Sequence, residues 1–364
     1  MRKGARWIVM AGAAVGVLLV VRACSAPSTP APNARDLPGK GRPSTEPTDE
    51  PTTAGGRPSG SASAAANKVR SADGGGAVVF FSPWGGSGLD QLGRDRPEEG
   101  NPLGPMSLSV DKRGRVYVLD EVNSRIVRRG ADGKAETAIR IESKTPEDIA
   151  VAADGSIAVL DRHDGQAVTL FDESGAMKGT LPLVGEGIED SGEVTGVFVD
   201  GNDIYAERAH GSLVKVGDTS GMPAEPRSEI PGRPTRDGLS YISAGITDPA
   251  TGRVYVASVE RATMEHRFTR ELRLKTIVHS IVLLDSDVQG TIYFGVELES
   301  AAGDSSVLLS CLEPLKGITV GTAVLPANTL PEETFRDFVV LDGGGVVYAV
   351  RSEQGVSYMQ YDCE

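Results

Sequence analysis

The sequence predicts an all-β protein folded as a six-bladed β-propeller. Glycine is abundant, at 45 of 364 residues, and aromatic residues make up only 5%, a composition that suits short strands and turns better than long helices. The strand-like segments are short and rich in β-branched residues, and turns of the type Asp-x-x-Gly join them. Glycine supplies the positive φ that such turns need. The pattern recurs about every 40–50 residues, the length of a four-stranded blade.

Strand–turn–strand units are clearest in the first half of the body. Each has an apolar strand, a polar turn and a second apolar strand, and a third strand follows. The three units are residues 105–120 with a strand starting near Asn123, 146–161 with 167–172, and 194–207 with 212–216. Equivalent turn positions lie at Gly114, Gly155, Asn202, Gly252, Gly290 and Gly345. Six such positions predict six blades.

The two ends of the body predict closure of a ring. Residues 77–81 form an isolated strand, and the last unit offers three strands, at 335–341, 346–351 and 356–361. An N-terminal strand added to these three would complete the last blade and remove an open sheet edge. Residues 261–275 leave little room for two outer strands, so we expect a short or irregular blade there.

The N-terminus predicts export. Arg2, Lys3 and Arg6 precede an unbroken apolar run of 15 residues, Trp7 to Val21, which fits a signal peptide and is short for a membrane span of ~20 residues. Val21-Arg22-Ala23-Cys24 resembles a lipobox, although Arg22 stands where a small residue is usual. Residues 1–24 are therefore a lipoprotein signal with lipidation at Cys24, a cleaved signal peptide, or an uncleaved anchor.

A linker separates this segment from the body. Residues 25–76 are mostly Pro, Ser, Thr, Ala and Gly, and Leu37 and Val69 are their only large apolar residues. Such a segment buries too little apolar surface to offset its ordering entropy, so we expect a disordered tether. The propeller domain then spans 77–364. We expect it outside the cytoplasm, in the periplasm or at the cell surface, anchored to the membrane through the N-terminus.

Cysteine usage agrees with export. If Cys24 is lipidated or removed, Cys311 and Cys363 remain as a pair that could form a disulfide in an oxidising compartment. Two separate buried thiols are the alternative, because pairing cannot be deduced from sequence alone.

Charge excludes one class of partner. The chain has a formal net charge of −13; residues 1–75 carry +5 and the remainder therefore −18. Nucleic-acid binding requires clustered Lys and Arg, so no nucleic-acid partner is expected.

Several residues resemble the NHL-repeat propeller family. The lead-in from Phe81 to Gly93 is similar to the glycine-rich stretch before an NHL unit. The repeat's core pattern matches at Pro105, Asp111, Gly114, Val116 to Val118, Asp120, Asn123, Arg125 and Ile126. The similarity is good over 80–175, fair to about 216 and poor beyond. It implies a six-bladed ring and leaves the function open, because propellers host unrelated activities.

Loops between the second and third strands of each blade open on one face in propellers of this kind, where a ligand site usually lies. In this chain those loops contribute a polar rim of candidate ligand-binding residues: Asp161, Arg162, His163, Asp164, Glu207, Arg208 and His210. Ordinary solvation of loops is the alternative explanation. Asp120, Asn123 and Arg125 fit a structural role within the repeat.

The sequence leaves two functions open, binding and catalysis. We expect a module that binds an envelope protein, a peptide or a glycan, and we predict no cofactor. The alternative is a metal-dependent hydrolase, lactonase-like with Ca²⁺ or another divalent cation, or a lyase. The catalytic and metal-binding residues of such an enzyme are unknown. His163 and His210 occupy comparable loops, but zinc usually takes three protein ligands. Walker, His-Glu-x-x-His, Gly-x-Ser-x-Gly and Cys-x-x-Cys motifs are absent.

Overall fold

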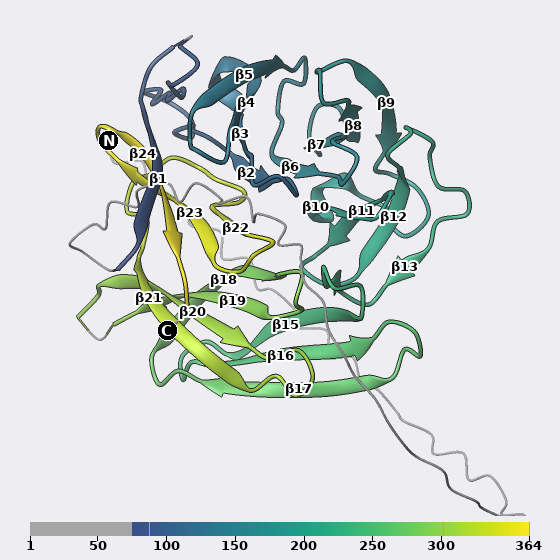
Figure 1. Cartoon of the computed structure of the whole chain (residues 1–364), viewed down its shortest axis with the longest axis vertical. Coiled ribbons are helices and arrows are strands. Elements are labelled where there is room, and N and C mark those ends of the chain that lie inside the picture. The colour runs from purple at the N-terminus through teal and green to yellow at the C-terminus, as the bar shows by residue number, and fades with distance from the viewer. Residues whose placement is uncertain (1–74, 87, 301, 364) are drawn as a thin grey trace, which may run out of the picture. The chain divides into compact units, whose positions relative to one another are not determined.

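The computed structural model describes residues 75–364 except 87, 301 and 364. The predicted signal or anchor, 1–24, and nearly all of the predicted linker, 25–76, lie outside the described residues. The described chain forms six antiparallel sheets of four strands each (Figure 1). The prediction of an all-β, six-bladed propeller is confirmed. Its helical content in this part is two 3₁₀ turns, η1 (Glu121–Asn123) and η2 (Ser191–Glu193), and none of its helices is long and apolar enough to cross a membrane.

Blades are numbered from the first complete sheet, and each runs from an inner to an outer strand. Blade 1 contains β2 (Ser107–Val110), β3 (Val116–Asp120), β4 (Arg125–Arg129) and β5 (Ala135–Arg140). Blade 2 contains β6 (Asp148–Val151), β7 (Ile157–Asp161), β8 (Ala167–Phe171) and β9 (Met177–Pro182). Blade 3 contains β10 (Val194–Asp200), β11 (Asp203–Arg208), β12 (Leu213–Asp218) and β13 (Glu229–Ile230).

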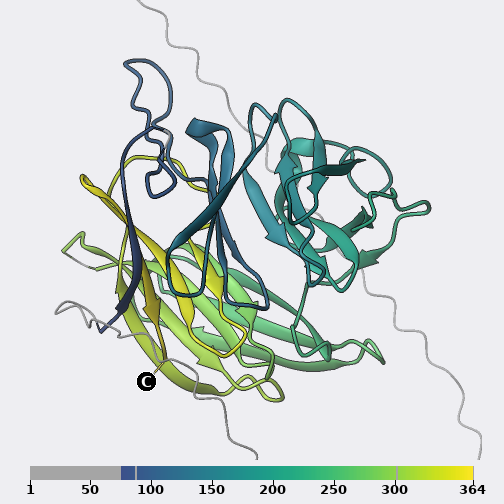
Figure 2. The ribbon, with the colours of Figure 1, turned by 45° about the horizontal axis from the view of Figure 1, so that its top comes forward.

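The second half of the ring contains the longest strands, which lie side by side in both views (Figure 2). Blade 4 contains β14 (Arg233–Pro234), β15 (Ser240–Asp248), β16 (Arg253–Glu260) and β17 (His266–Arg273). Blade 5 contains β18 (Ile277–Ser286), β19 (Ile292–Glu299), β20 (Ser305–Leu312) and β21 (Thr319–Pro326). Blade 6 contains β22 (Phe338–Val340), β23 (Val346–Ser352), β24 (Gly355–Tyr361) and, outermost, β1 (Ala77–Pro83).

Aspartate-led turns connect the strands, as the sequence pattern predicts. The Oδ1 atom of Asp111 accepts hydrogen bonds from the backbone amides two and four residues later, at 2.9 and 3.0 Å. Asp287 accepts the equivalent pair at 3.0 and 2.9 Å. Gly114 and Gly290 then take φ values of +75° and +85°, which cost glycine nothing. The same local chemistry therefore forms the turn in blades 1 and 5.

The N-terminal strand closes the ring. β1 pairs antiparallel with β24, with Ala77 opposite Gln360 and Pro83 opposite Gly355, and in Figure 1 it lies beside β24 although the two are at opposite ends of the described chain. Arg129 of blade 1 secures it: the Nη2 atom donates to Ser82 Oγ at 2.8 Å, and the guanidinium lies 4.7 Å from the ring centroid of Phe80.

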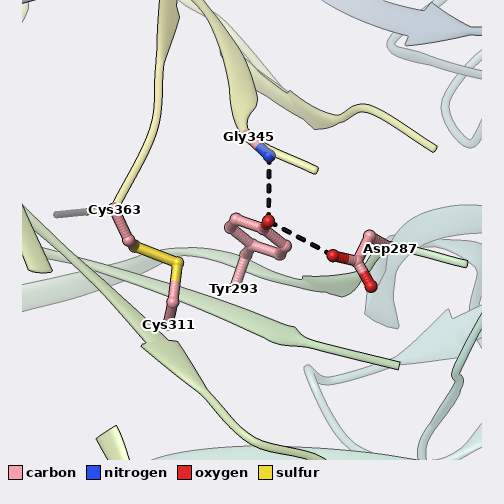
Figure 3. The surroundings of a disulfide bond; sticks show 5 residues. All are labelled: Asp287, Tyr293, Cys311, Gly345 and Cys363. Atoms are coloured by element: carbon pink, nitrogen blue, oxygen red, sulfur yellow. Dashed lines mark hydrogen bonds between the residues drawn. A yellow bond between two sulfur atoms is a disulfide. The ribbon is translucent and has the colours of Figure 1, made fainter. Parts of the chain in front are cut away.

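A disulfide joins the last two blades. Cys311 on β20 is bonded to Cys363, just after β24 (Figure 3), so the predicted pairing is present. Nearby, the Tyr293 hydroxyl accepts a hydrogen bond from the Gly345 amide at 2.9 Å and contacts Asp287 Oδ2 at 3.3 Å. Blades 5 and 6 are therefore held by a covalent bond and a buried polar contact.

Apolar clusters fill five of the six seams between blades. Separate clusters of buried side chains join blades 1 and 2, 2 and 3, 4 and 5, 5 and 6, and 6 and 1. Within the described residues, no such cluster contains side chains from both blade 3 and blade 4. That seam holds ion pairs instead: Glu207 binds Arg233, and Asp200 binds Arg261 at 2.6 Å, with Arg261 stacked 5.5 Å from the Tyr241 ring centroid.

The expectation of a short or irregular blade at 261–275 is wrong for that segment. His266–Arg273 forms a full outer strand, β17, paired with β16 along its length. The short strands are β13 and β14, of two residues each, on either side of the seam between blades 3 and 4. Residues 266–273 are mostly polar because most side chains of this outer strand are exposed. The segment therefore lacks the apolar pattern by which the other strands were predicted.

Loss of the disulfide should weaken the ring. The two cysteines are 52 residues apart, so the double variant Cys311→Ser/Cys363→Ser should lose about 4 kcal/mol of unfolding free energy on the chain-entropy model. Urea unfolding of variant and wild type measures the difference. Reduced wild type serves as the control and should match the variant, whereas an unchanged midpoint would contradict a stabilising bond.

Candidate functional site

A cavity of about 540 Å³ lies on the axis of the ring, where the inner strands of the six blades meet. Its wall includes residues from every inner strand and from the turns that follow several of them. The apolar part of the wall includes Val110, Val151, Val197, Phe198, Leu283 and Phe335. The charged part of the wall contains residues of both signs: Lys112, Arg233, Arg236 and Arg336, and Asp200, Asp285, Asp337 and Asp342.

Arg233 is held at the seam between blades 3 and 4. It lies on β14, and its Nε and Nη2 atoms donate to the two carboxylate oxygens of Glu207, at 2.7 and 3.1 Å. Its Nη1 atom donates to the carbonyl of Leu284 in blade 5 at 2.8 Å. One side chain thus joins three blades, and the two-pronged contact with Glu207 fixes the plane of the guanidinium.

Arg336 reaches across the axis. It precedes β22 of blade 6, and its Nη2 atom donates to Asp148 Oδ2 of blade 2 at 2.6 Å and to the carbonyl of Val197 in blade 3 at 3.2 Å. Its guanidinium lies 5.0 Å from the ring centroid of Phe198, and that of Arg233 lies 4.7 Å from the same centroid. Both guanidiniums therefore lie near the Phe198 ring, and each is attracted by the electron-rich face of that ring.

Unequal burial makes this part of the wall cationic. The side chains of Arg233 and Arg336 are each 22% exposed, whereas those of Glu207 and Asp148 are 2% and 0% exposed. The carboxylates lie behind the guanidiniums and do not line the cavity. A carboxylate or another small anion entering the cavity would meet partly desolvated guanidinium groups beside an aromatic ring, where charge-assisted hydrogen bonds are strong.

The turn side of the cavity is mixed in charge. Arg236, in the turn after β14, contacts Asp285 at 2.7 Å and Asp342 at 2.9 Å, and these carboxylates are 30% and 39% exposed. Cation and anions are therefore both accessible at this point. The charges are therefore unevenly placed: guanidiniums face the cavity near Phe198, both signs meet near Arg236, and Asp200 and Asp337 line the wall while their partners, Arg261 and Arg351, do not.

The predicted rim residues of blade 2 make mainly local contacts. Asp161 is buried and accepts hydrogen bonds from Ser143, from Thr145 at 2.8 Å and from the Asp164 amide at 3.0 Å. Burial alone would raise the pKa of Asp161, but these hydrogen bonds lower it overall. Arg162 and His163 both contact Glu147, and Asp164 contacts Lys144 at the surface. Arg162 also lies 5.2 Å from the ring centroid of Phe335, a wall residue.

The predicted rim residues of blade 3 lie nearer the cavity. Glu207 is the buried partner of Arg233, and His210, which lines the cavity, places Nδ1 3.6 Å from Glu207 Oε2. Arg208 turns away to the Gly187 carbonyl and Glu229. The structure thus brings Glu207 and His210 together at the cavity, whereas the four predicted residues of blade 2 make separate contacts. A ligand-binding role for the seven residues stays a prediction.

Burial and charge set the protonation of Glu207. Burial would raise its pKa, but the charge of Arg233, hydrogen bonds from His210 and Arg233, and the Thr195 hydroxyl lower it to about 2. Glu207 is therefore ionised throughout the ordinary pH range and holds Arg233 in place. Glu121 shows the reverse: burial, followed by repulsion from Glu147, Glu333 and Asp161, raises its pKa to about 7.

Sequence reasoning missed Phe198 and the three arginines. They occupy different positions in their repeats, so no shared motif marks them. The available signal is Thr334-Phe-Arg-Asp337 at the start of an expected inner strand, and Arg233-Pro-Thr-Arg236 between units. Charged residues at the start of an inner strand face the crowded axis, where burial is costly unless they are paired.

Within the described ranges, no group of three or more His, Cys, Asp or Glu side chains is arranged to hold a metal ion. His163 and His210, the histidines considered for zinc, contact different carboxylates, Glu147 and Glu207. The metal-dependent alternative therefore gains no ligand set from this part of the chain.

No protein-family model and no curated protein matches the sequence. Among solved structures, the chain is similar to Kuenenia stuttgartiensis hydrazine synthase, at 14% identity and TM-score 0.46, over 71% of this chain and 76% of that one. It is also similar to virginiamycin B lyase from Staphylococcus aureus (11%, TM-score 0.40, 71% and 95%) and to the RRP9 WD40 repeats (12%, TM-score 0.45, 73% and 96%). These likenesses concern the fold alone, and the NHL resemblance stays a prediction.

Acid should weaken the seam between blades 3 and 4 through Glu207. Because its folded pKa, about 2, lies below the ordinary 4.5, the stabilisation is present above pH 4.5 and is lost as pH falls toward 2, in total about 3 kcal/mol. The stability gap between wild type and Glu207→Gln in urea unfolding should therefore shrink by that amount between pH 6 and 2. Glu136→Gln, in a surface pair with Arg128, is the control. A gap that stays constant to pH 2 would contradict the role of this ion pair.

Proposed function

We propose that this protein is a membrane-tethered, extracytoplasmic propeller that binds an acidic peptide segment of an envelope protein in its axial cavity. The observation that carries the proposal is the exposure of Arg233 and Arg336 on the cavity wall while their carboxylates are buried. This part of the wall favours anionic groups, and the four aspartates that line the cavity lie elsewhere on the wall. The arginines need no rearrangement to offer it, because Glu207, Asp148 and Phe198 hold them in place.

Peptide is favoured over glycan by the rest of the wall. Valine and phenylalanine side chains from five of the six blades line the cavity beside the guanidiniums. An acidic side chain next to apolar ones matches both the guanidiniums and the apolar wall, whereas a neutral glycan brings no charge to the guanidiniums. A glycan that carries carboxylates shares the charged half of this chemistry and is the alternative ligand. Metal-dependent hydrolysis or lyase chemistry has no comparable support among the described residues.

Three features support export and tethering. The Cys311–Cys363 disulfide is the kind of bond that persists in oxidising compartments. Ahead of the propeller, the apolar run from Trp7 to Val21 ends three residues before Cys24, and a segment of linker composition follows. An anchored module of this type would hold its cavity away from the membrane surface, free to meet a partner.

Binding of an acidic peptide tests the cavity. The probe is a fluorescein-labelled nonapeptide of alternating glutamate and valine, measured by anisotropy at low salt. The charge-balanced variant Arg336→Met/Asp148→Asn should weaken binding at least ~10-fold, since it removes one guanidinium without leaving a buried unpaired carboxylate. Arg270→Met, on β17, should bind as wild type. Equal binding of the glutamine analogue, or an unaffected double variant, would refute the anion site.

Lipidation at Cys24 tests the tether. In a bacterial host fed an alkyne-labelled fatty acid, wild-type chain should take up the label and fractionate with membranes, and Cys24→Ser should do neither. Mass spectrometry of the N-terminus supplies the control by showing whether cleavage has occurred. An unlabelled, cleaved and released chain would contradict anchoring. An unlabelled but membrane-bound chain would replace the lipid with an uncleaved span.

A further inference from the structure

The outer strand of blade 5, β21, offers an open and uncharged sheet edge. Within the described chain it pairs with β20 on one side and with no strand on the other. Val320 and Val324 on this strand are 61% and 64% exposed, and Leu315 and Ile318 just before it are 62% and 49% exposed. Residues 317–331 contain no charged side chain. Long apolar edges of this kind are association sites unless something protects them.

The other outer strands are protected. β17 has the same length but carries Arg267, Arg270, Glu271 and Arg273. β5 and β9 contain charged residues as well, and β13 has only two residues. β1 lacks charge, but the turn at Gly133 approaches it so closely that a Cβ there would lie 2.6 Å from the Val79 carbonyl oxygen. Protection by charge, length or covering is therefore missing at β21, and its one irregularity is a register shift that leaves Val320 as an extra residue between Thr319 and Gly321 near the start of the strand.

The sequence of β21 is self-complementary when two copies run antiparallel. With Thr322 opposite Thr322 of a second copy, Val320 lies opposite Val324 and Gly321 opposite Ala323. Small residues then face small ones, and the two exposed valines cover each other on one face of the sheet. A two-fold axis through Thr322 requires this kind of matching, because each copy must offer the same patch.

Charge distribution points to the same place. The body carries a formal −18, so two copies repel over most of their surfaces. An uncharged stretch of 15 residues is where two such bodies approach without that cost. We propose that the β21 edge binds a second copy of this chain, joining the two blade 5 sheets into one eight-stranded antiparallel sheet.

Cysteine crosslinking tests the register. In the full chain, purified in detergent with Cys24→Ser, Thr322→Cys should form a covalent dimer when copper phenanthroline is added, because residues opposite on antiparallel strands have Cα atoms about 4.5–5.5 Å apart. Thr319→Cys is the matched control: its side chain is also exposed, but it lies opposite Leu325. Mixing Val320→Cys with Val324→Cys chains should give a mixed dimer, crosslinked between position 320 of one chain and position 324 of the other. Equal crosslinking at 319 and 322 would overturn the register.

Sedimentation of the same full chain tests the association itself. Wild type should sediment as a dimer at 10 µM after correction for bound detergent, and Val320→Lys/Val324→Lys as a monomer. Thr322→Pro is a second edge variant, and near-ultraviolet circular dichroism establishes that both variants remain folded. A monomeric wild type would refute the proposal. The same holds if the N-terminal segment of the same chain covers the edge, which would show as a monomer whose position 322 is protected from crosslinking.

Discussion

Closure of the ring is the constraint on which the rest of the structure depends. Each blade packs against two neighbours, so the last blade must reach the first. β1 provides that link by pairing with β24, and Arg129 of blade 1 binds it through Ser82. The disulfide between Cys311 and Cys363 holds blade 5 to blade 6 next to the same closure. The axial cavity exists because these contacts keep six inner strands facing one another.

The axial arginines serve the fold and the cavity at once. Arg233 takes the place of an apolar cluster at the seam between blades 3 and 4, and Arg336 links blade 6 to blades 2 and 3 across the axis. Burying their carboxylates fixes both guanidiniums without covering them. A site made in this way is rigid before a ligand arrives, which reduces the entropy lost on binding. It also leaves one seam dependent on charge.

Local patterns in the sequence were sufficient to predict the blades. Asp-x-x-Gly turns and β-branched strands act over a few residues, so the six units and the closing strand could be anticipated. The pairing of Cys311 with Cys363 was one of two possibilities that the cysteine count left open. The seam and the cavity could not, because they depend on which residues of separate blades meet at the axis. Glu207 illustrates the limit: its loop suggested an exposed rim residue, but Arg233, 26 positions later, makes it a buried ion-pair partner. Residues 266–273 misled for a related reason, since an exposed outer strand carries a polar sequence.

The ionic seam between blades 3 and 4 should open more easily than the five apolar seams. Native-state amide hydrogen exchange across the ring would compare β11, β12 and β15, on either side of that seam, with β3, β4 and β24, next to seams filled by apolar clusters. We expect the first group to exchange through a local opening of lower free energy, with the difference growing as pH falls below 4.5 and Glu207 becomes protonated. Exchange that begins instead at β24 and β1, or one opening energy for all six blades, would contradict a ring held by five apolar seams and one ionic seam.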